Sequence, residues 1–366
     1  MKTKKEIIDV TTGWINLNTG CNNRCLWCYR KGDFTSRAES IDFGMATQIV
    51  DFFCDLRIYS CIFIGGEPTL YDGLVDLVRK AKIGGIKEVT VVTNGRLLKN
   101  PKLVNEIEDV GLDVFSISIH SANEKTHNII ARTDSWQDTV SGIKNVIAVG
   151  GNCSLNVVAG NQNVDEIPES LPIFLGWGVK KIIVSCAIPH INGKKIDGSF
   201  ALEPRRFAAL VEKLTKQSKN VVILHELPLC LISRKTFLCL ARENRLGYGC
   251  HIGVGRGLSI DVDGNAIPCN SFPHHPILQL FKNGKMKYSS DSFQKVWGSN
   301  KTILALRKEA NVFRSSVCKK CELWEMCNCG CPLTWGYFNP DDYINDGLYG
   351  IKAKTVYNWT KRRYNP

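Results

Sequence analysis

Residues 14–28 read WINLNTGCNNRCLWC, a short β-rich run followed by cysteines at positions 21, 25 and 28. A loop that follows a strand lets each Cβ turn inward, so three thiolates at these spacings can converge on one metal centre. A zinc ion would need a fourth protein ligand, for which Cys54 or Cys61 would have to be recruited. An iron–sulfur cubane held by three cysteines would instead leave one iron open for chemistry.

From Trp14 to about residue 225, short β-rich runs alternate with segments of helical periodicity. This alternation predicts a parallel sheet with right-handed crossovers. Six such units fit an open or partial (β/α) barrel, in which functional residues gather at the carboxyl ends of the strands. The predicted strands are Trp14–Asn18, Cys61–Ile64, Glu88–Thr93, Val114–Ile119, Ser154–Val158 and Lys181–Cys186, and a last helix is predicted at Leu202–Leu214.

A second motif, Gly65-Gly66-Glu67-Pro68, follows the second predicted strand, and Thr93-Asn94-Gly95 ends the third. Two glycines let the backbone approach a ligand closely, and Glu67 offers an anion to an ammonium group. Together with the three cysteines, these motifs resemble the radical S-adenosylmethionine (radical SAM) superfamily over roughly residues 14–220. By this resemblance Cys21, Cys25 and Cys28 hold a [4Fe–4S] cluster whose open iron chelates SAM.

The resemblance also implies a reaction and a set of cofactor contacts. SAM would be cleaved reductively to a 5′-deoxyadenosyl radical that removes a hydrogen atom from the substrate, while the protein positions the reactants and tunes the cluster. Trp27 would pack near the adenine, the motif at 65–68 would meet the methionyl amino group, and Ser118 would meet the ribose. The implied cofactor-binding residues are Trp27, Gly65, Gly66, Glu67, Pro68, Thr93, Asn94, Ser118 and Arg132.

The chain contains 16 cysteines, and those near the C-terminus follow a dense pattern. Cysteines at short spacings in a chain without a signal-peptide core indicate metal binding more than disulfides. The spacings Cys250-x13-Gly264-x4-Cys269 and Cys318-x2-Cys321-x5-Cys327-x3-Cys331 resemble the SPASM extension, which carries up to two auxiliary [4Fe–4S] clusters; a zinc ribbon is the alternative. The resemblance assigns Cys250, Cys269 and Cys331 to the first auxiliary cluster and Cys318, Cys321 and Cys327 to the second.

The sequence departs from the SPASM pattern because no cysteine follows Cys331. The second auxiliary cluster therefore needs Cys329, an oxygen ligand from Asp341 or Asp342, or an open iron. Asn270 stands where sulfatase-maturing enzymes of this type carry an acidic base, and an amide cannot accept the released proton.

Two further groups of cysteines have open roles. Cys230 and Cys239 are candidates for the upstream ligand of the first auxiliary cluster. They are also candidates for a catalytic thiol that returns a hydrogen atom to the substrate, as in peptide epimerases of the superfamily. The scattered cysteines, Cys54, Cys61, Cys153 and Cys186, are expected to be buried packing residues.

The predicted fold is therefore α/β, with a partial (β/α)6 barrel at residues 10–225 and a small cysteine-rich SPASM domain at 226–345. That domain should contain a β-hairpin within 247–270, turning at Asp263–Asn265, and a helical stretch at Ser292–Lys308. Residues 346–366 are predicted to form a basic tail or helix.

The expected function is modification of a ribosomally made peptide by cross-linking, thioether formation or epimerisation. The net charge of +12 suits an acidic leader segment. Because 20 residues precede Cys21, we expect a separate leader-binding protein or the SPASM face to recognise the precursor peptide. The alternatives are a sulfatase-maturase-like enzyme, a small-molecule dehydrogenase and, more distantly, a non-catalytic iron–sulfur protein that binds nucleic acid. In the last of these, the motifs at 21–28 and 65–68 would have no purpose.

The remaining expectations concern location and partners. No apolar run approaches the length of roughly 18–20 residues that a membrane span needs, so a cytoplasmic location without membrane contact is expected. A flavodoxin or ferredoxin is expected as the electron donor. Nucleic acid is not expected as a partner.

Overall fold

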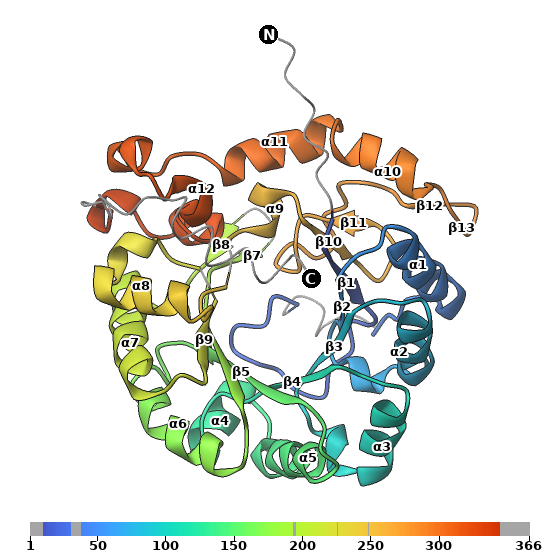
Figure 1. Ribbon diagram of the computed structural model, residues 1–366, viewed down its shortest axis with the longest axis horizontal. Helices are drawn as coiled ribbons and strands as arrows, with labels where there is room; N and C mark the ends of the chain where they lie inside the picture. The colour runs from blue at the N-terminus through green and yellow to red at the C-terminus, as the bar shows by residue number, and fades with distance from the viewer. Residues whose placement is uncertain (1–9, 31–37, 193–194, 225, 248, 345–366) are drawn as a thin grey trace. The chain divides into compact units, whose positions relative to one another are not determined.

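The computed structural model describes residues 10–30, 38–192, 195–224, 226–247 and 249–344 (Figure 1). The chain forms two compact units. The first comprises residues up to Ser118, Ala131–Cys153 and Val254–Lys308, and the second comprises Ile119–Ile130, Ser154–Gly253 and the residues from Glu309 onward. The basic tail or helix predicted at 346–366 lies outside the described residues.

The first unit is built on strands in the order β11-β10-β1-β2-β3-β4. Strands β1 to β4 run parallel, with Gly13 opposite Cys61 and Val91 opposite Phe115. The predicted hairpin is present, and its first strand, β10, joins the sheet parallel to β1. The strands are β1 (Thr12–Asn16), β2 (Ser60–Ile64), β3 (Glu88–Thr93), β4 (Val114–Ser118), β10 (Gly257–Ile260), β11 (Ala266–Ile267) and the separate pair β12 (Phe281–Lys282) and β13 (Lys285–Met286).

The helices of the first unit bury one apolar face each, as crossovers of a parallel sheet must. In α1 the Asp42 carboxylate accepts a hydrogen bond from the Met45 amide and caps the helix, and Ile49 and Phe53 are buried. The ring of Phe52 meets that of Phe293 edge to face, which packs α1 against α10. The helices are α1 (Phe43–Asp55), η2 (Pro68–Leu70), α2 (Leu74–Ile83), η3 (Leu97–Lys99), α3 (Pro101–Asp109), α5 (Trp136–Ala148), α10 (Ser290–Trp297) and α11 (Lys301–Ala310).

The second unit contains the parallel strands β5-β6-β9, in that order. Its longest helix, α7, begins with Pro204, where a missing N–H costs nothing, and buries Phe207 and Leu214. The elements are α4 (Glu124–Ala131), β5 (Cys153–Ala159), α6 (Ile167–Gly176), β6 (Lys181–Cys186), β7 (His190–Asn192), β8 (Lys195–Asp197), α7 (Pro204–Gln217), β9 (Val221–Ile223), η4 (Leu229–Leu231), α8 (Arg234–Arg242), α9 (His251–Val254), η5 (Ser316–Lys320), α12 (Trp324–Cys327), η6 (Pro332–Gly336) and η7 (Pro340–Asp342).

The predicted strands are present, although β1 begins two residues earlier than expected. The predicted helix at Ser292–Lys308 is two helices, because the chain ends α10 at Gly298 and starts again at Asn300. The Gly298 amide donates to Gln294 O, and the Asn300 side chain caps the next turn by accepting from the amide of Thr302. Within the described residues, no helix combines the length and apolar character that a membrane crossing requires.

Candidate active site

Three sequence motifs lie at the carboxyl ends of neighbouring strands in the first unit. The cysteine loop follows β1, the motif at 65–68 follows β2, and Thr93-Asn94-Gly95 ends β3. Since β1, β2 and β3 are adjacent and parallel, their carboxyl ends share one edge of the sheet. The structure thus brings together the motifs that the sequence placed at strand ends.

Gly66 is required by close backbone packing. Its amide donates to Asn18 O at 2.7 Å, and the Glu67 amide donates to Gly20 O at 2.8 Å. A Cβ at position 66 would stand 2.2 Å from Gly20 O, so no larger residue fits there. This turn therefore fixes the backbone immediately before Cys21.

Glu67 is buried, and its carboxylate accepts hydrogen bonds from the chain itself. The donors are the Thr69 hydroxyl at 2.6 Å, the Thr93 hydroxyl at 2.5 Å and the Asn94 amide at 2.7 Å. Burial raises the pKa of Glu67, and these hydrogen bonds oppose the rise. The side chain therefore holds the motif at 65–68 to the end of β3, and contact of its carboxylate with a SAM ammonium group stays a prediction.

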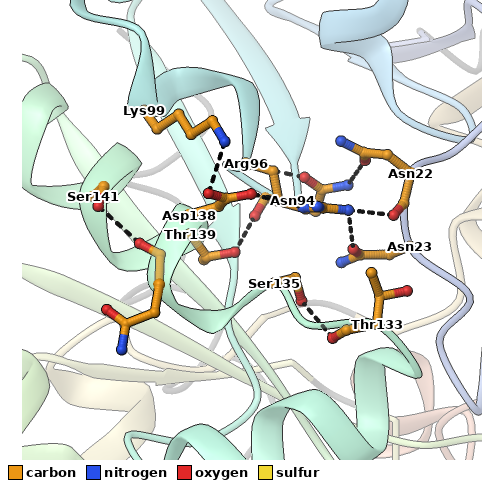
Figure 2. Close-up of polar contacts among 11 residues, drawn as sticks. Asn22, Asn23, Asn94, Arg96, Lys99, Thr133, Ser135, Asp138, Thr139 and Ser141 are labelled. Carbon is orange, nitrogen blue, oxygen red and sulfur yellow. Dashed lines mark hydrogen bonds and ion pairs between the residues drawn. The ribbon is translucent and has the colours of Figure 1, made fainter.

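Arg96 carried no signal in the sequence, although it directly follows the motif at 93–95. Its guanidinium donates to Asn22 O and to Asn23 Oδ1 in the cysteine loop, and it pairs with Asp138 at 3.3 Å (Figure 2). Lys99 also contacts the Asp138 carboxylate, at 2.9 Å. Arg96 therefore ties the loop to the start of α5.

The thiols of the loop fit the donor set of an iron–sulfur cluster. Cys21 Sγ accepts hydrogen bonds from the Asn23 amide at 3.4 Å and from the Asn94 side chain at 3.8 Å, the kind of contact that tunes a ligand sulfur. Burial, followed by the charge of Glu67, raises the pKa of Cys21 to about 12. Burial raises the pKa of Cys25, as do the nearby Cys28 and Cys21. Such thiols bind as thiolates only when a metal compensates the charge.

The remaining residues predicted to contact the cofactor differ in burial and in the strand or helix that carries them. Trp27 is buried beside the cysteines, and Pro68 begins η2. Ser118 is half-buried at the end of β4, whereas Arg132 is exposed with a left-handed φ of 53° just after α4. In the described part of the chain, no three His, Cys, Asp or Glu side chains already surround one point as a metal ion would require. The roles of Cys21, Cys25 and Cys28 as cluster ligands, and of the other named residues as cofactor contacts, therefore stay predictions.

Two residues that follow the hairpin strands, Asp261 after β10 and Asn270 after β11, make polar contacts within the first unit. Arg30, which follows the cysteine loop, forms an ion pair with Asp261, and both side chains are 1% exposed. Asp261 also accepts a hydrogen bond from the His274 amide at 2.9 Å. Asn270 Oδ1 accepts from the Asn16 side chain at 3.1 Å, so the residue at the sulfatase-maturase base position is an amide paired with another amide.

The cysteines assigned to auxiliary clusters are divided between the units. Cys269 follows β11 in the first unit, whereas Cys250 and Cys331 belong to the second. In the second unit, a cavity of about 20 Å³ is lined by apolar side chains and by Cys230, Cys318, Cys321, Cys327 and Cys329. The Sγ atoms of Cys318 and Cys329 are 3.4 Å apart; their hydrogen bond lowers the pKa of Cys318 and raises that of Cys329.

The other cysteines are mostly packing residues. Cys61, Cys153 and Cys186 are buried, as expected, while Cys54 is only partly buried. Cys239, on α8, accepts a long contact of 3.8 Å from Arg245 and does not line the cysteine cavity. A hydrogen-donor role for Cys230 or Cys239 stays a prediction.

A partly buried acid in the second unit, Glu226, carried no sequence signal. The Glu226 carboxylate, just past β9, accepts a hydrogen bond from the Cys186 amide, and its backbone carbonyl accepts from the Cys331 amide at 3.1 Å. Burial raises the pKa of Glu226 to about 8. Periodicity does not mark a single acid in a loop, so only the fold reveals it.

Comparison with known proteins agrees with these motifs. Residues 15–171 match the Radical SAM superfamily. A probable GTP 3′,8-cyclase of Saccharolobus islandicus is 31% identical over 171 residues, which is 46% of this chain and 54% of that protein. The chain thus spans about half the length of the curated relatives it matches.

Two solved proteins resemble nearly the whole chain in fold. SuiB of Streptococcus suis bound to S-adenosylmethionine has a TM-score of 0.66 at 18% identity, covering 94% of this chain and 78% of SuiB; SuiB is also solved bound to its precursor peptide SuiA. The protein anSMEcpe, with bound AdoMet and the Cp18Cys peptide, has a TM-score of 0.65 at 15% identity, covering 96% of this chain and 95% of that one.

These likenesses show the fold, an α/β partial barrel with a parallel sheet followed by a cysteine-rich region. Residues 15–171 are therefore similar in sequence to the Radical SAM superfamily, and the three motifs at adjacent strand ends lie within that region.

Proposed function

We propose that this protein cleaves SAM reductively and removes a hydrogen atom from a residue of a peptide substrate. The observation that carries the proposal is the meeting of the cysteine loop, the motif at 65–68 and Asn94 at adjacent strand ends. A [4Fe–4S] cluster held by Cys21, Cys25 and Cys28 would supply the electron for this cleavage.

The chain's own residues would hold and orient the cofactor. Gly66 and Asn18 fix the backbone before Cys21, so the thiols project from a stiff turn. Glu67 accepts a hydrogen bond from Thr93 and so holds the motif at 65–68 to the end of β3. Arg96 donates to Asn22 O and so holds the cysteine loop. The buried Trp27 offers an apolar face that would exclude water from the reacting atoms.

A peptide substrate is favoured by the likeness to SuiB and anSMEcpe, because both are solved with bound peptides and resemble nearly the whole chain. The net charge of +12 suits an acidic leader, and a separate leader-binding protein is the proposed recognition partner. Side-chain cross-linking, thioether formation or epimerisation are the outcomes we propose. The sulfatase-maturase alternative is weakened because Asn270 is an amide already paired with Asn16.

The auxiliary clusters, the electron donor and the location belong to the same proposal. One or two auxiliary [4Fe–4S] clusters would be held by the SPASM-type cysteines, and a flavodoxin or ferredoxin would supply electrons. A cytoplasmic location would keep these thiols reduced.

The proposal is tested by anaerobic reconstitution of the full chain, followed by reduction and addition of SAM. Formation of 5′-deoxyadenosine and methionine, followed by mass spectrometry, is expected; no cleavage by fully reduced, iron-loaded protein would refute the proposal. Iron content should approach about twelve per chain if all three clusters form. Deuterium transfer into 5′-deoxyadenosine from deuterated acidic peptides, encoded near this gene, is then compared with transfer from deuterated GTP. Transfer from GTP alone would refute the peptide substrate.

A further inference from the structure

The SPASM pattern leaves the second auxiliary cluster one ligand short, and the cysteine cavity offers two thiols that the pattern does not assign. They are Cys230 and Cys329, which line the cavity together with Cys318, Cys321 and Cys327. Among the described residues that line it there is no Asp or Glu, and Asp341 and Asp342 are exposed on η7. The cavity therefore provides a sulfur ligand and not an oxygen ligand.

The backbone holds Cys230 at this cavity. The amide of Leu229, its neighbour in η4, donates to Cys327 Sγ at 3.3 Å. The Cys331 amide donates to Glu226 O, and a Cβ at Gly330 would stand 2.3 Å from that same oxygen. Segments 226–230 and 327–331 are therefore packed backbone against backbone, which fixes where Cys230 lies.

Cys329 competes for space with a ligand. Its Sγ lies 3.4 Å from Cys318 Sγ, so the two sulfurs occupy the same side of the cavity. Four thiolates around a cubane must occupy four separate corners, because each binds a different iron. Cys318 belongs to the C-x2-C pair, which leaves Cys329 as a hydrogen-bonding neighbour of a ligand sulfur.

We propose that Cys230 is the fourth ligand of a [4Fe–4S] cluster held with Cys318, Cys321 and Cys327, in place of the cysteine that the sequence lacks after Cys331. Cys230 comes from η4, whereas Cys318 and Cys321 come from η5 and its C-cap and Cys327 comes from α12, so the four thiols reach the cavity from three segments. Cys230 is partly buried and packs against the buried Cys318, Cys329 and Ile344, so its thiol lies among the other cavity residues. This assignment rests on the proposed function only in that the chain is an iron–sulfur protein.

The test uses the full chain with Cys21, Cys25 and Cys28 all changed to Ala, so that the iron counted is auxiliary iron alone. Adding Cys230→Ala should lower iron by about four per chain or convert one cluster to a three-iron form, seen by Mössbauer and EPR spectroscopy. Cys153→Ala, a change of the same kind at a buried cysteine outside the cavity, and Cys329→Ala should each retain the iron and the spectra.

Three results would overturn the assignment. They are unchanged iron and spectra in the Cys230→Ala variant, loss of iron in Cys329→Ala instead, and no auxiliary iron in the parent background. Circular dichroism of the same samples separates iron loss from unfolding, and a Cys230→Ser variant that keeps the iron with altered spectra would support ligation. Formation of 5′-deoxyadenosine by the chain with Cys21, Cys25 and Cys28 intact is measured separately, so failure here is distinguishable from failure of the proposed function.

Discussion

The cysteine loop at 21–28 and the cysteine cavity of the second unit carry the same ligand atom in opposite surroundings. Around the loop stand Asn22, Asn23, Asn94 and Arg96, whose amides and guanidinium hold a polar, partly open turn. The cavity is lined by apolar side chains and five thiols. The polar turn suits a cluster that binds a charged cofactor, whereas the apolar cavity suits a cluster that only transfers electrons.

Removing one thiol from each region should give the largest difference between the cysteine loop and the cysteine cavity. Cys25→Ala should abolish 5′-deoxyadenosine formation, because two thiolates do not hold a site-differentiated cluster. Cys327→Ala should lower the iron content of the second unit yet leave SAM cleavage measurable. Mass spectrometry measures 5′-deoxyadenosine formation by both variants. Cys54→Ala is the control, and its lost packing should cost no more than about 1–2 kcal/mol of unfolding free energy. Full cleavage by Cys25→Ala would contradict the site.

The next largest effect should come from the buried ion pair that lies just after the loop. Arg30→Ala leaves the Asp261 carboxylate buried and unpaired, which should cost about 3–5 kcal/mol of unfolding free energy. The exposed pair Arg79 with Asp76 is the matched control, because Arg79→Ala should cost less than about 1 kcal/mol. Denaturant unfolding of both variants measures the difference, and equal losses would show that the burial of Arg30 is not the cause.

Low pH should destabilise the second unit more than the first. Burial lowers the pKa of His120 to about 3 and of His127 to about 4, so both are neutral in the folded second unit and charged when it unfolds below pH 6.5. The contribution of the two histidines to the free energy of unfolding is complete above pH 6.5 and is lost as the pH falls, at up to about 1.4 kcal/mol per pH unit per histidine. Glu226 of the same unit, whose pKa burial raises to about 8, gains stability as the pH falls and offsets one of the two histidines. The Asp261 pKa is lowered from 3.8, so the first unit keeps that contribution to lower pH. Hydrogen exchange at pH 5 should show the second unit opening first, and His127→Gln should reduce the difference; simultaneous opening would contradict it.

The smallest predicted effect tests the brace on the polar loop. Asp138→Asn removes a partly exposed partner of Arg96 and should weaken SAM binding by no more than about fivefold, equivalent to about 1 kcal/mol. Lys99→Ala, which removes the other contact of the same carboxylate but does not touch the loop, is the control. Isothermal titration with SAM compares them, and an equal loss in Lys99→Ala would assign the effect to general charge.

Strand periodicity and motif spacing were enough to predict the parallel strands and the motifs at their carboxyl ends. The strand at Glu88–Thr93 and that at Lys181–Cys186 have the predicted bounds, because apolar runs between helices leave little choice. Arg96 and Glu226 were missed because a single charge in a turn has no period, and its role depends on the residues that the fold brings to it. The pairing of β10 with β1 was missed as well, because strands so far apart in the chain leave no local signal for their partnership.

The pairing of β10 with β1 also decides whether the N-terminal and C-terminal regions of this protein can be exchanged separately. Residues 257–260 complete one edge of the sheet beside β1, and Asp261 neutralises the buried Arg30 next to the cysteine loop. A shortened protein that ends with the matched region, after residue 171, would lack β10 and Asp261. The edge of β1 would then expose unpaired backbone N–H and C=O groups, and the buried Arg30 would lose its carboxylate partner. Grafting that region onto a foreign C-terminal half therefore requires moving the hairpin with it, so the two must be exchanged as one piece.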